Sequence, residues 1–271
     1  MRSGLTGLFC LASALLFVYT VTCGINYYRQ TFSTVAGFEL KESSNEELLA
    51  LCEELAGLVN ETAPLLKLDE EGRSVLSGNV RAISREAMEQ LGTKYSCLSG
   101  YYPLPKPLVV SKLLAVQQLC GIYSPFTIEA NYNREMTPYN IPFTVCHELS
   151  HLKGFMREDE ANFIAFLACR DSESAQFRYS AYLMAYIHST NALYRSAGAE
   201  AYQAVHESLC ITAQRDLVAN NVYWDQYDTK VAEVANNMND TYLRANSQSD
   251  GVKSYGRMVD LLLAGYRARH K

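Results

Sequence analysis

The residues with the clearest chemical potential are His147, Glu148 and His151, which form the pattern H-E-x-x-H. On a helix, the two histidines lie four residues apart on one face, with Cβ atoms about 6 Å apart. That spacing allows both imidazoles to reach one Zn²⁺ ion at about 2.0–2.1 Å. Glu148 lies one residue further round the helix, where it can take a proton from a water molecule without acting as a ligand. We therefore predict a zinc site with Glu148 as its general base.

A catalytic zinc site needs a third protein ligand and an open position for water. Gly154 is expected to end the H-E-x-x-H helix, and Glu158 and Asn162 then share one face of the next helix. We predict that Glu158 is the third ligand and that Asn162 hydrogen-bonds to a ligating imidazole, which fixes its tautomer. Glu160 is the alternative ligand. Asp159 is expected to favour the helix N-terminus by its charge.

Other side chains are weaker candidates for the chemistry. Tyr255, with Arg257 nearby, can donate a hydrogen bond to a transition-state oxyanion, although a packed tyrosine is the alternative. His188 can do the same, or can be an ordinary polar residue of a helix face. Cys146 is expected in the core. The motif itself has an alternative too, an amphipathic helix with surface His and Glu, but two of only five histidines fall within it.

The elements that must position these residues are mostly helical. Pro142 suits the first turn of the motif helix, and Asn45 is expected to cap the first helix of the soluble part. The alternation in GIYSPFTIEANYN predicts a strand over 121–133, at a sheet edge because of Pro125. Residues 111–120 can form a helix, and residues 100–107 are expected to be irregular. Helices are predicted over 45–60, 79–91, 142–153, 158–170, 174–196, 199–222, 226–246 and 252–268. The fold class is therefore mainly α with a small β-sheet (α+β).

The N-terminal segment has a different character. No charged side chain lies between Arg2 and Arg29, and the apolar run from Leu5 to Cys23 would span roughly 28 Å as a helix. We predict a membrane anchor over 1–29 and a soluble domain over 30–271, facing outward with Arg2 inside. The alternatives are a cleaved signal peptide and a lipid attached to Cys23.

Composition excludes one class of partner and leaves the compartment open. The net charge is −5 and the pI is about 5.6, whereas a nucleic-acid binder normally shows a basic surplus. Of the eight cysteines, six lie outside the anchor, and none forms a C-x-x-C pair. Both disulfides and buried free thiols are consistent with that spacing.

The motifs resemble those of the gluzincins, zinc metallopeptidases with H-E-x-x-H on one helix and E-x-x-A-[DN] on the next. The matching residues of the second motif are Glu158, Ala161 and Asn162. The metzincin pattern is excluded because Arg157 stands where its third histidine would be. The resemblance implies that the edge strand pairs with a peptide substrate. This chain departs from many gluzincins in the short link from His151 to Glu158.

The whole chain is similar to an uncharacterised family of bacterial membrane-anchored H-E-x-x-H proteins. The resemblance is carried by PFTVCHELSHLKGFMREDEANFIAFLAC and VANNMNDTYLRANSQSDGVKSYGRMVDLLLA. Members of that family often begin with two hydrophobic segments, of which one is visible here. The resemblance implies a zincin-like domain. We expect a membrane-anchored zinc endopeptidase that acts on a peptide or protein. The alternative is a non-catalytic zinc-bearing membrane sensor or interaction protein, against which the intact Glu148 argues.

Overall fold

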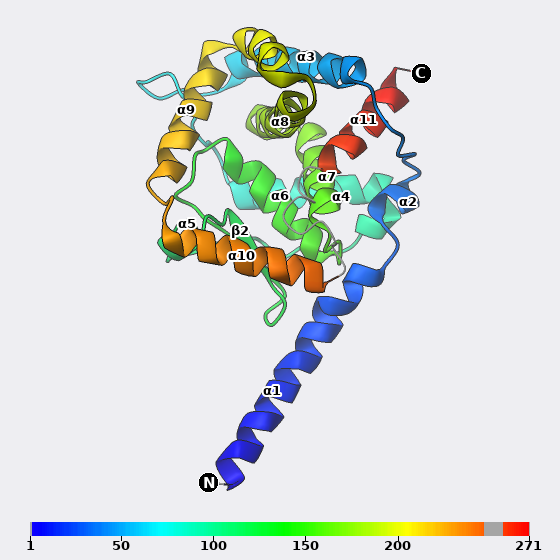
Figure 1. Cartoon of the computed structure of the whole chain (residues 1–271), viewed down its shortest axis with the longest axis vertical. Helices are drawn as coiled ribbons and strands as arrows, with labels where there is room; N and C mark the ends of the chain where they lie inside the picture. Colours follow the sequence, from blue (N-terminus) through cyan, green and yellow to red (C-terminus); the bar gives the residue numbers. More distant parts are fainter. Residues whose placement is uncertain (1, 247–256, 271) are drawn as a thin grey trace.

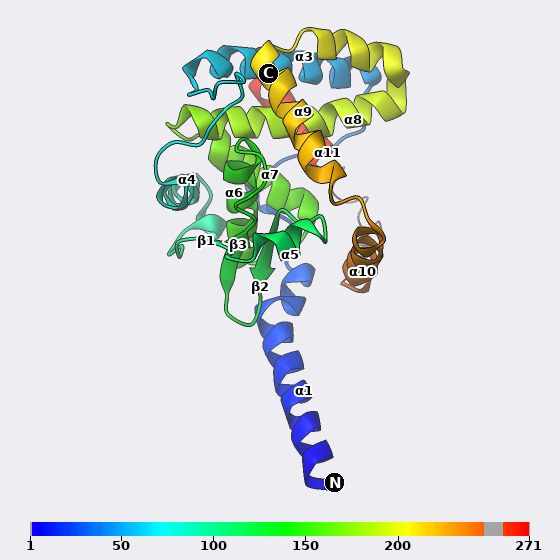
Figure 2. The same ribbon diagram turned by 90° about the vertical axis from the view of Figure 1, so that its left-hand side faces the viewer.

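A computed structural model describes residues 2–246 and 257–270. A long helix, α1 (Arg2–Thr22), projects from a helical body and carries the N-terminus far from it (Figures 1 and 2). The short helix η1 (Gly24–Tyr28) joins α1 to the body. The prediction of a mainly helical chain with a small sheet is confirmed.

The helices of the body lie in two levels around α8 (Ala175–Glu207). The helix α3 (Asn45–Thr62) packs along one side of α8, while α6 (Asn140–Leu152) and α7 (Glu158–Arg170) pack against the other (Figure 2). The remaining helices are α2 (Phe32–Ala36), η2 (Ala63–Leu65), α4 (Val80–Lys94), η3 (Ser96–Leu98), α5 (Ser111–Ala115), α9 (Ile211–Asp225), α10 (Lys230–Ala245) and α11 (Met258–Arg269).

The sheet has three short strands where the sequence predicted one. They are β1 (Lys106–Pro107), β2 (Gly121–Ser124) and β3 (Glu129–Tyr132), in the order β1-β3-β2. The expected strand over 121–133 is wrong as a single element, because the chain turns at Pro125 and Ile128 adopts a left-handed φ of 53°. β2 and β3 therefore form an antiparallel hairpin, and β2 keeps the predicted edge position.

Several predicted helix boundaries need correction. Ser44, not Asn45, caps α3, and its hydroxyl and the Glu47 carboxylate form a capping box. The helix expected over 111–120 ends at Ala115. The predicted break near Gly198 is present, because Gly198 has a non-helical φ of 87° and ψ of −176° between two helical segments of α8. A further break, which was not predicted, falls before α9 at residue 211. Residues 252–256 of the last predicted helix lie outside the described part, and α11 begins at Met258.

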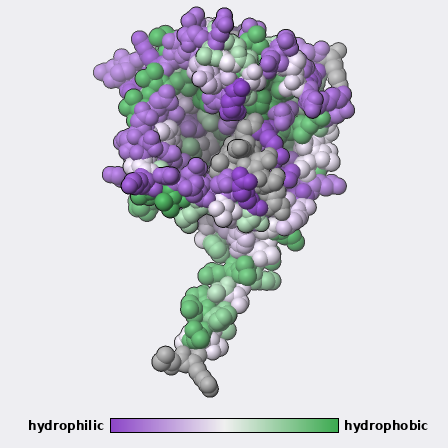
Figure 3. All heavy atoms as spheres, in the orientation of Figure 1, coloured by the Kyte–Doolittle hydropathy of each residue, from purple (hydrophilic) through white to green (hydrophobic). Residues whose placement is uncertain are grey.

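One helix among the described residues is long and apolar enough to cross a membrane. The stretch Gly4–Tyr28 has a mean hydropathy of 2.1, and the protein covers almost none of it. The hydrophobic colouring of the projecting helix continues to the base of the body (Figure 3). A signal sequence near an N-terminus has the same properties, so this helix establishes a possible span and not its orientation.

The hydrophobic core surrounds α6 and α7. Every side chain of α7 from Glu158 to Cys169 is buried, including three consecutive acids. Cys146 of α6 is fully buried, as predicted. None of the eight cysteines, all of which lie in the described part, forms a disulfide. Burying acids at the centre of the body is costly unless they have charged or hydrogen-bonding partners.

Candidate metal centre

A tight turn brings α7 back against the end of α6. Gly154 has a left-handed φ of 80°, its N–H donates to the His151 carbonyl, and the Phe155 N–H donates to the Ser150 carbonyl. This is a Schellman ending, which favours glycine at that position. The link from His151 to Glu158 is shorter than in many gluzincins, but this turn lets it bring Glu158 back to the two histidines.

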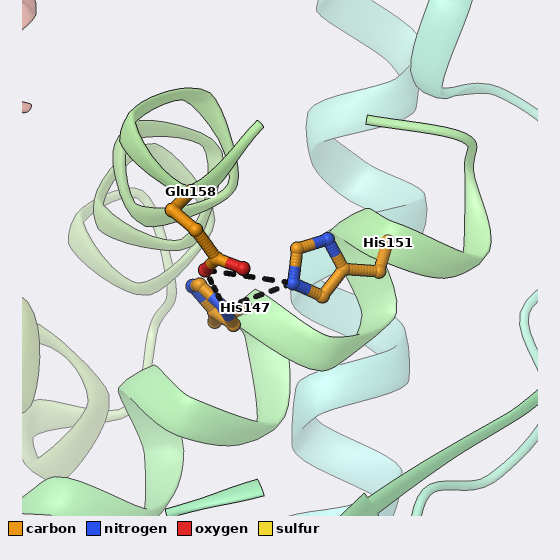
Figure 4. Close-up of side chains that lie close together, drawn as sticks. All are labelled: His147, His151 and Glu158. Carbon is orange, nitrogen blue, oxygen red and sulfur yellow. Dashed lines mark hydrogen bonds and ion pairs between the residues drawn. The ribbon is translucent and has the colours of Figure 1, made fainter. Parts of the chain in front are cut away.

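The turn places three potential ligand atoms around one point (Figure 4). His147 Nε2 lies 3.0 Å from His151 Nε2 and 3.1 Å from Glu158 Oε2, and the third side of the triangle is 3.8 Å. Ligands about 2.0–2.1 Å from a tetrahedral zinc lie roughly 3.3 Å from each other. The cluster of His147, His151 and Glu158 can therefore hold a metal ion of that size.

Both imidazoles present the correct nitrogen to this point. His151 Nδ1 lies 2.8 Å from the Phe155 carbonyl oxygen, which only accepts, so Nδ1 carries the hydrogen. His147 Nδ1 lies 2.8 Å from Asn162 Oδ1 and donates to it in the same way. The Nε2 lone pairs are left for a metal. The hydrogen bond predicted between Asn162 and a motif histidine is present.

Glu158 and Glu160 face different parts of the protein. The Glu158 carboxylate points between the two imidazoles (Figure 4), whereas Glu160 Oε1 accepts a hydrogen bond from the Ser33 N–H of α2. Burial raises the pKa of Glu160 to about 7. The geometry thus favours Glu158 as the third ligand.

Glu148 is buried beside the edge strand. Its Oε2 has no hydrogen-bond partner, and a Cβ built on Gly121 would lie only 2.5 Å from its Oε1. Burial raises the pKa of Glu148 to about 8, which the His147 charge opposes and the Glu158 charge reinforces. A divalent cation at the three ligands would lower this pKa again.

The two histidines differ in their electrostatics. Burial lowers the pKa of His147, but the hydrogen bond and charge of Glu158 outweigh that effect and leave it raised. Burial lowers the pKa of His151 to about 4, and Glu158 only partly offsets it. A neutral His151 is ready to ligate at neutral pH.

Two adjoining cavities open from the site. Both are lined by Gly121, His147, Glu148 and Asn239, so the motif helix, the edge strand and α10 share them. The first extends to α8 and also contacts Met184, His188 and Asn236. The second extends to the end of α1 and also contacts Tyr19, Cys23, Tyr27, Tyr123, Phe126 and Tyr242.

Comparison with known families assigns nearly the whole chain to one family. The profile of a family described as a protein of unknown function, DUF3810, matches residues 2–263. The chain belongs to the DUF3810 family. No curated protein and no solved structure matches it. The expectation of an uncharacterised family is thus confirmed for this DUF3810 chain, and the family adds no activity of its own.

The other predicted site residues of the DUF3810 chain lie in different places. His188 lines the first cavity, and burial lowers its pKa to about 4. Arg257 forms an ion pair with Asp159, with Nε 3.6 Å from Oδ2, so Asp159 has a second charged neighbour besides the helix N-terminus. Tyr255 lies outside the described residues.

Sequence reasoning missed three residues that line the site. Gly121 permits the close approach of β2 to Glu148, and Asn236 and Asn239 line the cavities from α10. The glycine carried a usable signal, since an isolated glycine in a strand often marks a close approach of backbone to another group. The asparagines carried none, because only the tertiary fold brings α10 to the motif.

Proposed function

We propose that this DUF3810 chain is a membrane-anchored zinc endopeptidase with a zincin-like domain. The observation that carries the proposal is the convergence of His147 Nε2, His151 Nε2 and Glu158 Oε2, beside a buried Glu148 whose Oε2 has no hydrogen-bond partner. Two imidazoles and one carboxylate are a donor set of catalytic zinc sites, which keep a further position open.

The donor set fits a bound zinc ion. The ligand-atom separations suit its bond lengths, and hydrogen bonds at both Nδ1 atoms orient the Nε2 atoms. When bound, Zn²⁺ supplies Lewis acidity, which polarises a peptide carbonyl and makes a water molecule more acidic.

Glu148 moves the proton in this proposal. Its carboxylate accepts a proton from the attacking water and passes it to the leaving amine. The side chain follows His147 on α6, so its carboxyl group points to the cavity beside the ligands rather than between them. A purely structural metal site would not require a buried acid with one carboxylate oxygen left without a hydrogen-bond partner at this place.

The edge of β2 that faces away from β3 offers a place for the substrate backbone, next to the Tyr123 N–H that hydrogen-bonds to Glu148. The Asn133 N–H donates to the Cys120 carbonyl, so in this antiparallel register the backbone groups of Gly121 and Tyr123 point away from β3. An extended peptide can pair with such an edge. That pairing would lay its scissile bond beside Glu148, which contacts Gly121 closely.

Two residues are candidates for stabilising the transition-state oxyanion. His188 lines the cavity and stays neutral at pH 7, so its ring N–H can donate a hydrogen bond. Tyr255 remains a candidate from its residue type alone.

Membrane attachment through α1 completes the proposal. The helix is apolar and almost uncovered by protein, which favours a lipid environment. We propose a single span with the body outside the cytoplasm.

The test compares the full-length chain with Glu148→Gln, both purified in detergent without chelator. We expect about one zinc per chain in both, by elemental analysis, and a loss of about 10²-fold or more in turnover on a peptide library for the variant. Absence of stoichiometric metal would refute the zinc site. Bound zinc without wild-type turnover would instead support the non-catalytic sensor.

A further inference from the structure

The outer face of α10 is apolar and exposed. Val231, Val234 and Met238 are 55%, 58% and 69% exposed. At 100° per residue these three side chains fall on one side of the helix, together with Tyr242. Only Ala232 among the helix's first ten residues is buried. An apolar face of this kind on a helix marks a contact surface rather than scattered surface residues.

Tyr242 fixes the direction of that face. Its hydroxyl lies 3.3 Å from the Tyr19 hydroxyl, 3.4 Å from the Tyr27 hydroxyl and 3.4 Å from Cys23 Sγ, all at the end of α1. The apolar face of α10 is therefore turned to the side from which α1 leaves the body. In Figure 1 α10 lies across this end of the body, and in Figure 2 it is seen nearly end-on, to one side of α1.

The β2–β3 turn points the same way. It projects from the body beside α1 in both views, and its Phe126 and Ile128 are 54% and 50% exposed (Figures 1 and 2). The Tyr123 hydroxyl donates to the Thr22 carbonyl at 3.2 Å, which ties β2 to the last turn of α1. Two elements far apart in sequence thus present apolar side chains where the apolar span meets the body.

We propose that this end of the molecule rests on the lipid bilayer, with α10 lying in the interfacial layer and the β2–β3 turn inserted beside it. The inference rests on the membrane anchor of the proposed function. A bilayer is favoured over a protein partner because the surface is continuous with α1, whose apolar side chains need lipid.

The charged side chains of α10 indicate whether the lipid headgroups must carry a charge. Lys230 and Arg244 balance Glu233 and Asp240 within the helix, so attraction to anionic headgroups is not required. A zwitterionic bilayer is sufficient once α1 holds the body close to it. Because Asn239 lines both cavities from the inner side of α10, this placement puts the metal cleft at the membrane surface.

The test uses the full-length chain in phosphatidylcholine nanodiscs with and without brominated acyl chains. Trp224 is the only tryptophan, so Trp224→Phe gives a background for single reporters. Met238→Trp reports the apolar face, and its neighbour Asn237→Trp is the matched control on the polar face. Phe126→Trp reports the turn, and Leu11→Trp reports the span.

We expect bromine to quench Met238→Trp and Phe126→Trp about twofold or more, and to leave Asn237→Trp nearly unchanged. Quenching of Leu11→Trp without quenching of Met238→Trp would overturn the inference and leave the anchor intact. An unquenched but blue-shifted Met238→Trp would assign the face to a protein partner or a second copy, which also overturns it. An unquenched Leu11→Trp would overturn the anchor and the inference together, while zinc binding and turnover would still be judged separately.

Discussion

Two regions depart in opposite directions from the rule that apolar side chains are buried and charged side chains are exposed. They are the region around α6 and α7 and the outer face of α10. In the first region, charged and polar side chains such as Glu148, Glu158 and Asn162 are buried. In the second, Val234 and Met238 are exposed to the surroundings. Buried polar groups and exposed apolar patches are the two informative exceptions in a protein. Each region therefore indicates a partner beyond the chain, and the two partners differ in kind.

The two exceptions also differ in how rigidly they are built. The imidazoles of His147 and His151 are fixed by hydrogen bonds at both Nδ1 atoms and by the turn at Gly154. Within the described residues, α10 has two buried side chains, Ala232 and Leu243, and the polar contacts of Tyr242 to the end of α1. A metal site needs fixed geometry, whereas a surface on lipid needs only a face of the right chemistry.

The largest effect is expected from removing a ligand in the rigid region. Glu158→Ala should lower zinc affinity by more than the roughly 10–100-fold typical of outer residues, because it removes one of three ligand atoms. Glu160→Ala should change it by only a few-fold, since Glu160 faces Ser33. Competitive chelator titration of both variants measures the ranking, and the reverse order would reassign the ligand.

Gly121→Ala should reduce turnover by about 10²-fold while leaving zinc bound. The added Cβ would meet the Glu148 carboxyl at 2.5 Å and displace the proposed base from its position. Gly57→Ala, in an open position of α3, is the matched control and should keep full activity. Peptide turnover and zinc content are measured together, and an active Gly121→Ala enzyme would contradict the role given to this contact.

Asn162→Ala should weaken zinc binding by about 10–100-fold. The substitution removes the acceptor that orients His147 but no ligand atom. Asn162→Asp keeps an acceptor at the same position and should retain tighter binding than the alanine variant. Equal affinities for wild type and Asn162→Ala would mean that α6 alone orients the imidazole.

The site could be predicted from sequence where it depends on local spacing. His147 and His151, or Glu158 and Asn162, are four residues apart on single helices, so their common faces follow from helix geometry. The contact of Gly121 with Glu148 could not be predicted, because it joins a strand and a helix through the tertiary fold.

The errors in the fold have local physical causes. The turn between β2 and β3 was missed because Phe126 and Ile128 continue the alternation of a strand and no Asn-Gly pair marks the turn. The turn depends instead on the left-handed conformation of Ile128. The break at Gly198 was predictable from the glycine, and the backbone is indeed non-helical there. The break before Ile211 was missed because it contains neither glycine nor proline.

The smallest effect is expected on the face of α10. Met238→Ala should change the free energy of unfolding by no more than about 0.5 kcal/mol in detergent, because an exposed side chain loses few contacts. Leu243→Ala removes one of the two buried side chains of α10 and should open this helix locally. Hydrogen exchange then shows faster exchange in α10 while α6 and α7 keep their protection, since their core does not depend on Leu243. A loss of about 2 kcal/mol or more in Met238→Ala would mean that this face packs on protein. That result would mean that the face is not exposed, whereas a near-neutral variant agrees with a face that the rest of the chain leaves uncovered.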